Sequence, residues 1–321
     1  MTKRLNLLVP TDFSVASRAG IRFAIQLAGQ QNAHITFVHV LTLFRRHNWS
    51  DRQFEAFAAT ERRCRKEQLE TLVADVRRRH PLRPGATSTL VLEGLSADLA
   101  LIDYCQRHPD IDLICMGTRG ASKVNKLFGT NTGNLITHSD TPVIAVPALY
   151  RKKEISRLLY ITDLIHGQEE LKEVVALAKP LHARLSVLHL MQPGELNFDT
   201  RLLQKVWKKE FGYPVDVDFR PANSNITVVA DLEQTIRRLR PSLVVMFSNR
   251  RRTLFEAIFY PSHAERLSFR TRTPILVMGK NDPNGVQDRP KEEESVMRSD
   301  LRTKSRSRGR QPATRLKARQ S

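Results

Sequence analysis

The segment 112–147 constrains the fold more than any other part of the chain, because two short apolar runs in it enclose a glycine-rich loop and a helix start. The first run, 113–116, ends at a glycine and is short enough for a buried parallel strand. The second run, 143–146, follows Thr141 and Pro142, and this pair ends a helix predicted over 131–138. Strand, loop, helix and strand in this order predict an α/β sheet.

The loop has the composition of a phosphate site. Glycines let the backbone approach an anion, and the free amides of a helix start point at it. The residues that form this predicted cradle are Gly117, Gly120, Gly129 and either Thr130 or Asn131 as the N-cap of the helix. Arg119 adds positive charge. The alternative is that the glycines only turn the chain. The loop is neither a P-loop, since Gly129 is followed by threonine and asparagine, nor a dinucleotide G-x-G-x-x-G motif.

The N-terminal segment predicts a strand, a helix and a second parallel strand. The apolar run 5–9 precedes Pro10, Thr11 and Asp12, Ser14 is the predicted cap of a helix to about residue 28, and 33–41 is the next strand. Asp12 then lies at the carboxyl end of the first strand, where open α/β sheets bind ligands. It is predicted to contact a ribose hydroxyl or a metal-bound water, or alternatively to cap a turn.

These motifs resemble the universal stress protein family over residues 1–148. The resemblance rests on the run Pro-Thr-Asp-Phe-Ser at 10–14, the pair His39 and Val40, and the loop spacing G-x2-G-x8-G-T, one residue shorter than the family's G-x2-G-x9-G-[ST]. It implies a doubly wound parallel sheet of five strands in the order 3-2-1-4-5, with helices on both faces. The resemblance further implies that this domain binds ATP, with or without Mg²⁺.

The resemblance also implies a role for each site residue. The backbone near Val40 meets adenine, and Asp12 lies against the adenosine. Ribose and phosphates are held at Gly117, Arg119, Gly120, Gly129, Thr130 and Asn131, and Pro10, Thr11 and Met116 complete the expected ATP site. His39 is predicted to be a packed strand histidine, not a catalyst.

The intervening segments predict a long surface helix at 49–80, a strand at 87–92, and a helix that Ser96 caps and that ends near Arg107. After the polar linker 150–156 the pattern repeats. The matching segments are 157–163 with 5–12, 184–191 with 35–41, 243–246 with 113–116, and 273–277 with 141–145. We therefore predict two copies of one domain, at 1–149 and 155–280. The third strand of the second copy stays open between 214–220 and 226–229.

The second copy is predicted to be degenerate. Phe247 stands near the position of Gly117, and no glycine occurs between Gly212 and Gly279. A phosphate cradle needs backbone without side chains in the way. The arginines at 250–252 either bind an anion by charge or are solvated.

The net charge of +19 suggests an anionic partner. Residues 301–321 hold eight lysines and arginines and no acidic residue, and the whole segment 281–321 is predicted to be a disordered tail. Binding of nucleic acid or another polyanion through the basic body and tail is therefore the alternative to an ATP-binding role in stress response or regulation. A third hypothesis is a scaffold without ligand.

Other classes of protein are excluded by what the sequence lacks. No apolar run approaches the ~20 residues that span a bilayer, and the N-terminus has no signal peptide, so we expect a cytoplasmic protein without membrane contact. Three scattered cysteines suit reduced thiols, and no zinc spacing occurs. No catalytic triad is legible, so we expect no enzyme, with slow ATP hydrolysis as the alternative. The oligomer is either a homodimer or a pairing of the two copies within one chain.

Overall fold

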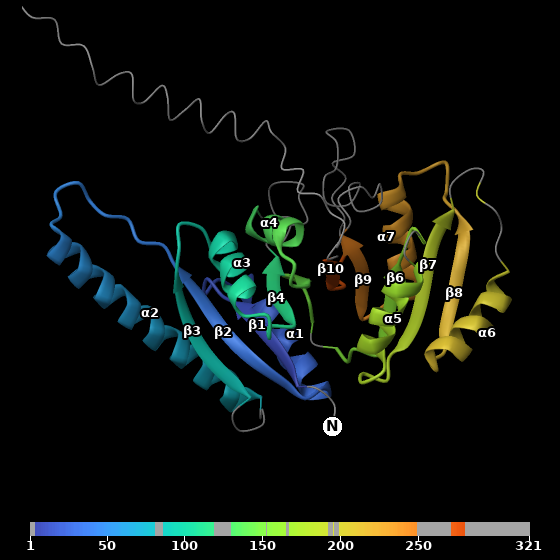
Figure 1. The fold of residues 1–321 in the computed structure, drawn as a ribbon, viewed down its shortest axis with the longest axis horizontal. Helices are drawn as coiled ribbons and strands as arrows, with labels where there is room; N and C mark the ends of the chain where they lie inside the picture. Colours follow the sequence, from blue (N-terminus) through green and yellow to red (C-terminus); the bar gives the residue numbers. More distant parts are fainter. Residues whose placement is uncertain are drawn as a thin grey trace, which may run out of the picture. The chain divides into compact units, whose positions relative to one another are not determined.

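A computed structural model of the 321-residue chain describes residues 4–80, 86–118, 130–151, 153–164, 167–191, 195, 199–248 and 271–279 (Figure 1). All of them belong to the unit Met1–Lys280. The predictions for Arg119, Gly120, Gly129, the arginines at 250–252 and the tail at 281–321 lie outside the described residues.

The first half alternates strands and helices. Its elements are β1 (Leu5–Pro10), α1 (Ser17–Gln30), β2 (Ala33–Leu41), α2 (Asp51–Arg79), β3 (Thr87–Glu93), α3 (Ala97–Arg107), β4 (Leu113–Thr118), α4 (Thr130–His138) and β5 (Val143–Pro147). The strands run parallel in the order β3-β2-β1-β4-β5. This confirms the predicted order 3-2-1-4-5.

The second half repeats that order. Its elements are β6 (Arg157–Ile161), α5 (Gly167–Ala178), β7 (Arg184–Met191), α6 (Thr200–Phe211), β8 (Val215–Pro221), α7 (Val228–Leu239), β9 (Leu243–Ser248) and β10 (Ile275–Gly279). Strands β8-β7-β6-β9-β10 follow one another across the sheet and pair in parallel. Of the two candidates for the third strand, 214–220 is therefore the correct one. The other leads into α7, whose N-cap Thr227 accepts the amide of Ala230.

Antiparallel pairing of β5 with β10 joins the two halves into one ten-stranded sheet. Ile275 lies opposite Ala145 in that register. The linker is tied back to the first half, since the amide of Ile155 donates to Gln30 Oε1 at 2.8 Å. The two halves of the described structure thus pair edge to edge within one chain.

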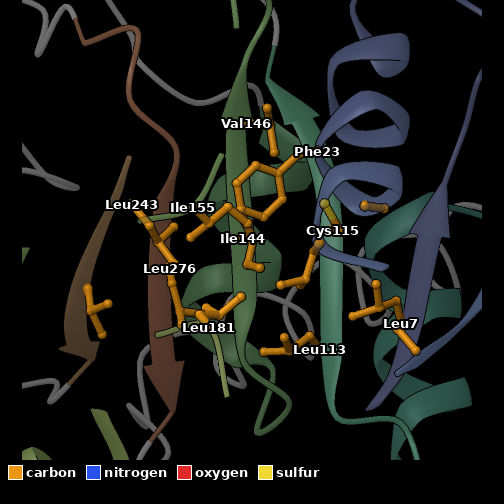
Figure 2. Packing of buried hydrophobic residues seen from close by; sticks show 14 of the residues in the cluster. Leu7, Phe23, Leu113, Cys115, Ile144, Val146, Ile155, Leu181, Leu243 and Leu276 are labelled. Atoms are coloured by element: carbon orange, nitrogen blue, oxygen red, sulfur yellow. The ribbon is translucent and has the colours of Figure 1, made fainter. Parts of the chain in front are cut away.

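Alternating strand residues bury both faces of the sheet. In β1, Leu7 and Val9 belong to a cluster that also contains residues of α1, α2 and α5, whereas Leu8 belongs to a second cluster that contains residues of α3, α4 and α7. The first of these clusters crosses the junction, and Figure 2 shows Phe23 and Cys115 of the first half in the same cluster as Leu243 of the second half. A shared core under both halves follows from this continuity.

Most predicted helices form, with shifts at their N-termini. Ser14 is not the N-cap of α1, because the chain turns once more and the helix begins at Ser17, whose amide donates to Ser14 Oγ at 3.2 Å. Helix α4 begins at Thr130, so neither Thr130 nor Asn131 precedes it as the predicted cap. Ser96 occupies the N-cap position of α3 without a capping hydrogen bond from its side chain.

Candidate functional site

The turn that leaves β1 is held by backbone and hydroxyl hydrogen bonds. The amide of Thr11 donates to the carbonyl of Val38 at 2.8 Å, and the amide of Phe13 donates to Thr11 Oγ1 at 3.1 Å. Phe13 has a φ of 64°, a backbone conformation that residues other than glycine rarely adopt. Ser17 and Thr11 also join their hydroxyls at 3.0 Å. The turn is therefore a fixed frame for the residue between Thr11 and Phe13.

That residue is Asp12, and its side chain is exposed at the sheet edge. Its Oδ1 accepts the amide of Ser14 at 3.0 Å, as in a capping turn. Partial burial raises the pKa of Asp12, but the hydrogen bonds from Ser14 and Ser17 lower it by more, so the pKa lies below its ordinary value. A fixed and ionised carboxylate is thus presented to solvent at neutral pH.

His39 is a packed strand histidine. Its Nδ1 lies 2.8 Å from the carbonyl oxygen of Thr11, and its ring centroid is 4.7 Å from that of Phe13. Because a carbonyl only accepts, Nδ1 must carry the proton. Sequence reasoning missed that His39 and Ser17 buttress the turn; the signal was the presence of hydroxyl and imidazole groups on either side of Asp12.

Gly117 at the end of β4 has a role that the sequence did not indicate. A Cβ at this position would lie 2.2 Å from the carbonyl oxygen of Ala16 and 3.0 Å from Cα of Ser17. A Cβ at Gly20 would likewise lie 2.7 Å from the amide nitrogen of Gly117. Glycine is thus required here because the start of α1 packs backbone-to-backbone on β4. This packing alone explains the glycine at position 117, without the predicted contact between its backbone and an anion.

The other predicted residues share the carboxyl edge of the sheet. Pro10 ends β1 opposite Val38 of β2, and β4 pairs with β1 on its other side. The strands β1 to β3 therefore follow one another in one direction and β4 to β5 in the other, and the order reverses between β1 and β4. Val40 and Met116 are half-buried near the ends of β2 and β4. Thr132 of α4 donates its hydroxyl to Met116 Sδ at 3.4 Å, which places the start of α4 beside β4.

The structure therefore brings part of the predicted set to one edge. Pro10, Thr11, Asp12, Val40, Met116 and Gly117 lie at the carboxyl ends of three adjacent strands. Thr130 and Asn131 begin α4, and Asn131 is exposed. Arg119, Gly120 and Gly129 belong to the part of the chain that is not described.

The second half repeats the turn but fills the space beside it. Leu164 has a φ of 66° and donates its amide to Thr162 Oγ1 at 2.9 Å, and His189 Nδ1 lies 3.0 Å from the carbonyl oxygen of Thr162. The other ring nitrogen of His189 is 2.8 Å from a carboxylate oxygen of Glu195. Phe247, at the position of Gly117, is buried in the core with its ring 5.9 Å from that of Tyr160.

Three further features of the described residues concern metal binding, membrane-spanning helices and a buried thiol. Among them, no group of three or more histidine, cysteine, aspartate or glutamate side chains is placed to hold a metal ion. None of the helices that the structure describes combines the length and apolar composition needed to cross a bilayer. Burial raises the pKa of the Cys115 thiol, which donates to the carbonyl of Gly20 at 3.3 Å.

Comparison with known proteins finds a sequence match in the first half. Residues 3–147 match the sequence model of the Universal stress protein family. No curated protein matches the chain.

Solved structures are similar to the chain over both halves. A universal stress protein from Archaeoglobus fulgidus DSM 4304 has a TM-score of 0.63 at 19% identity, covering 87% of this chain and 97% of that one. A putative universal stress protein from Pseudomonas aeruginosa UCBPP-PA14 has a TM-score of 0.56 at 14% identity, covering 86% and 94%. A functionally unknown protein from Pseudomonas aeruginosa PAO1 has a TM-score of 0.53 at 14% identity, covering 86% and 93%. At these identities the similarity shows the fold.

Proposed function

We propose that the universal stress protein domain at residues 3–147 binds ATP at the carboxyl edge of β1, β2 and β4, and that the chain acts in stress response or regulation without efficient catalysis. The observation that carries this proposal is the position of the Asp12 turn. It lies where the strand order reverses, and the start of α4 packs beside the neighbouring strand. Nucleotides bind at such reversal points in open α/β sheets.

Each described group has a part in the proposed site. The exposed Asp12 carboxylate accepts a hydroxyl of the ribose, and the backbone near Val40 contacts adenine. The amides at Thr130 and Asn131 face the phosphates, because the first amides of a helix have no partner within it. Where Mg²⁺ accompanies the nucleotide, the phosphates and Asp12 supply the oxygen ligands that this ion prefers.

Replacing Gly120 with valine is expected to abolish ATP binding and leave the fold intact. The physical reason is that a β-branched side chain prevents the close approach of backbone to phosphate. Isothermal titration calorimetry measures the binding, and the melting temperature reports the fold. Gly29→Val is the matched control, because a Cβ at Gly29 meets no atom within 4 Å. Unchanged ATP affinity in a folded Gly120→Val variant would refute the proposed site.

The second half is expected not to bind ATP, so calorimetry should give one ATP per chain. The reason is that the segment after β9 contains no glycine before Gly279, and that Glu195 lies against His189 beside the corresponding turn. The same titration of the full chain gives the stoichiometry. Two equivalent ATP sites per chain would contradict this prediction, and so would retention of one site in the Gly120→Val variant.

A further inference from the structure

We infer that a second ligand site lies at the junction of the two halves, and that it takes a small polyanion carrying phosphate or carboxylate groups. A cavity of about 510 Å³ opens there, between the segment after β5, the C-terminal end of α7 and the residues that precede β10. We call it the junction cavity. Its volume falls within the roughly 300–1,000 Å³ of small-molecule sites.

The lining of the junction cavity is strongly cationic. The linker contributes Arg151 and Lys153, α7 contributes Arg237 and Arg240, and the segment before β10 contributes Arg272. Among the described residues of the lining, Glu233 is the carboxylate, and it pairs with Arg237 at 3.4 Å. A cavity lined by one sign of charge raises the local concentration of ligands of the opposite sign.

Four of these cations have no carboxylate partner in the described part of the chain: Arg151, Lys153, Arg240 and Arg272. Many other surface arginines do have one, including Arg238 of the same helix, which pairs with Asp218 at 3.3 Å. Guanidinium groups bind phosphate and carboxylate in a planar, two-pronged geometry. The unpaired cations therefore supply the recognition chemistry that a polyanion needs.

Arg240 is held at the cavity by an unusual backbone conformation. It ends α7 with φ 47° and ψ 53°, in the left-handed region where glycine is the common residue. The last carbonyls of a helix carry partial negative charge, so this helix end alone repels an anion. The several full positive charges around the cavity outweigh that partial charge. Arg240 thus brings a full positive charge to the edge of the cavity.

Apolar residues also line the junction cavity, which favours a small molecule with an uncharged portion. Ile236 and Pro274 line it and are buried, and Leu149 lines it while 67% exposed. The described residues of the lining offer no exposed aromatic ring for stacking, because Tyr150, the aromatic residue among them, is buried. Bases of single-stranded nucleic acid bind mainly by such stacking. The lining therefore favours a compact polyanion over an extended nucleic acid.

The test is a titration of the full chain with inorganic triphosphate and, separately, with citrate. The test variant is Arg240→Gln/Arg272→Gln, and the control is Arg201→Gln/Lys205→Gln, which removes the same charge from exposed positions of α6. We expect the affinity for the tighter-binding probe to fall at least tenfold in the test variant only. The dependence of log Kd on log salt should also become shallower, because two fewer cations are neutralised. The tighter probe tells whether phosphate or carboxylate is the preferred chemistry.

The same titration separates this inference from the proposed ATP site. In the Gly120→Val background, triphosphate binding that depends on Arg240 and Arg272 should persist, because none of the described residues that line the junction cavity belongs to the segment 117–131. Equal affinities in the test and control variants would overturn the inference, as would the absence of binding of either probe at low salt. An oligonucleotide that bound more tightly than both probes through the same two arginines would overturn the assignment to a small ligand.

Discussion

A chain with alanine in place of Gly117 is expected to unfold at a melting temperature roughly 6–12 °C below that of the parent protein. The added Cβ would lie 2.2 Å from the carbonyl oxygen of Ala16, and this atom belongs to the backbone, so no side chain can rotate away. Either β4 or the start of α1 must shift. Overpacking of this kind costs about 3 kcal/mol, at the upper end of its usual range, and about 1 kcal/mol moves the melting temperature by roughly 2–4 °C in a domain of this size.

The matched control for Gly117→Ala is Gly29→Ala. Gly29 lies in α1, and a Cβ there meets no atom within 4 Å. Alanine in a helix interior is more stable than glycine by about 0.5–1 kcal/mol, so the control should melt slightly higher than the parent. Scanning calorimetry of both variants measures the difference. Equal melting temperatures for the two would show that β4 and α1 accommodate a methyl group.

This result also matters for how the candidate site is tested. Gly117 was predicted to admit an anion, yet the space beside it is occupied by the start of α1. A loss of ATP binding in a Gly117 variant would therefore report a displaced helix as readily as a lost contact. A test of the proposed ATP site at Gly117 therefore needs a measurement of the fold beside the measurement of binding.

Removal of Asp231 is expected to destabilise the second half by about 3–5 kcal/mol. Its carboxylate is buried at the start of α7 and accepts from Arg220 at 2.7 and 3.2 Å and from the amide of Asn223 at 3.0 Å. In Asp231→Ala, Arg220 keeps its charge but loses these two hydrogen bonds. The guanidinium is then left with Thr235 Oγ1 at 2.6 Å as its side-chain partner among the described residues. Denaturant unfolding of the variant gives the change in free energy.

The contribution of Asp231 depends on pH with a definite sign. The hydrogen bonds from Arg220 hold the pKa of Asp231 below its ordinary value. Its stabilisation is therefore complete above the unfolded pKa of about 3.9 and is lost as the pH falls through the lowered pKa of the folded state. Stability of the parent should fall more steeply below about pH 4 than that of Asp231→Asn.

Asp216→Ala is the matched control, because Asp216 pairs with Arg184 at 2.6 Å on the surface, where the two side chains are 49% and 73% exposed. Such pairs contribute about 0–1 kcal/mol. A cost for Asp231→Ala as small as that of the control would contradict the prediction. If the free energy of unfolding fell with the same slope below about pH 4 in the parent and in Asp231→Asn, the assigned pH dependence would be wrong.

The amino-acid sequence by itself determined most of the local elements, because short apolar runs such as 113–116 and 143–146 favour buried strands. The strand order 3-2-1-4-5 was predicted from the resemblance to the universal stress protein family, and the first half confirms it. Ser50 and Gln53 form a capping box at the start of α2 that is readable as a local pattern. The turn at Asp12 was also predictable, because proline, threonine and aspartate act through their immediate neighbours.

Only the tertiary structure decided what depends on contacts between distant segments. The third strand of the second half, the pairing of β5 with β10, the fit of Gly117 against Ala16 and the cationic lining of the junction cavity all join residues far apart in the chain. A glycine in a loop has the same local signature whether a phosphate or a helix approaches it. Which one does so is determined by the path of the rest of the chain, since close packing leaves room for one neighbour.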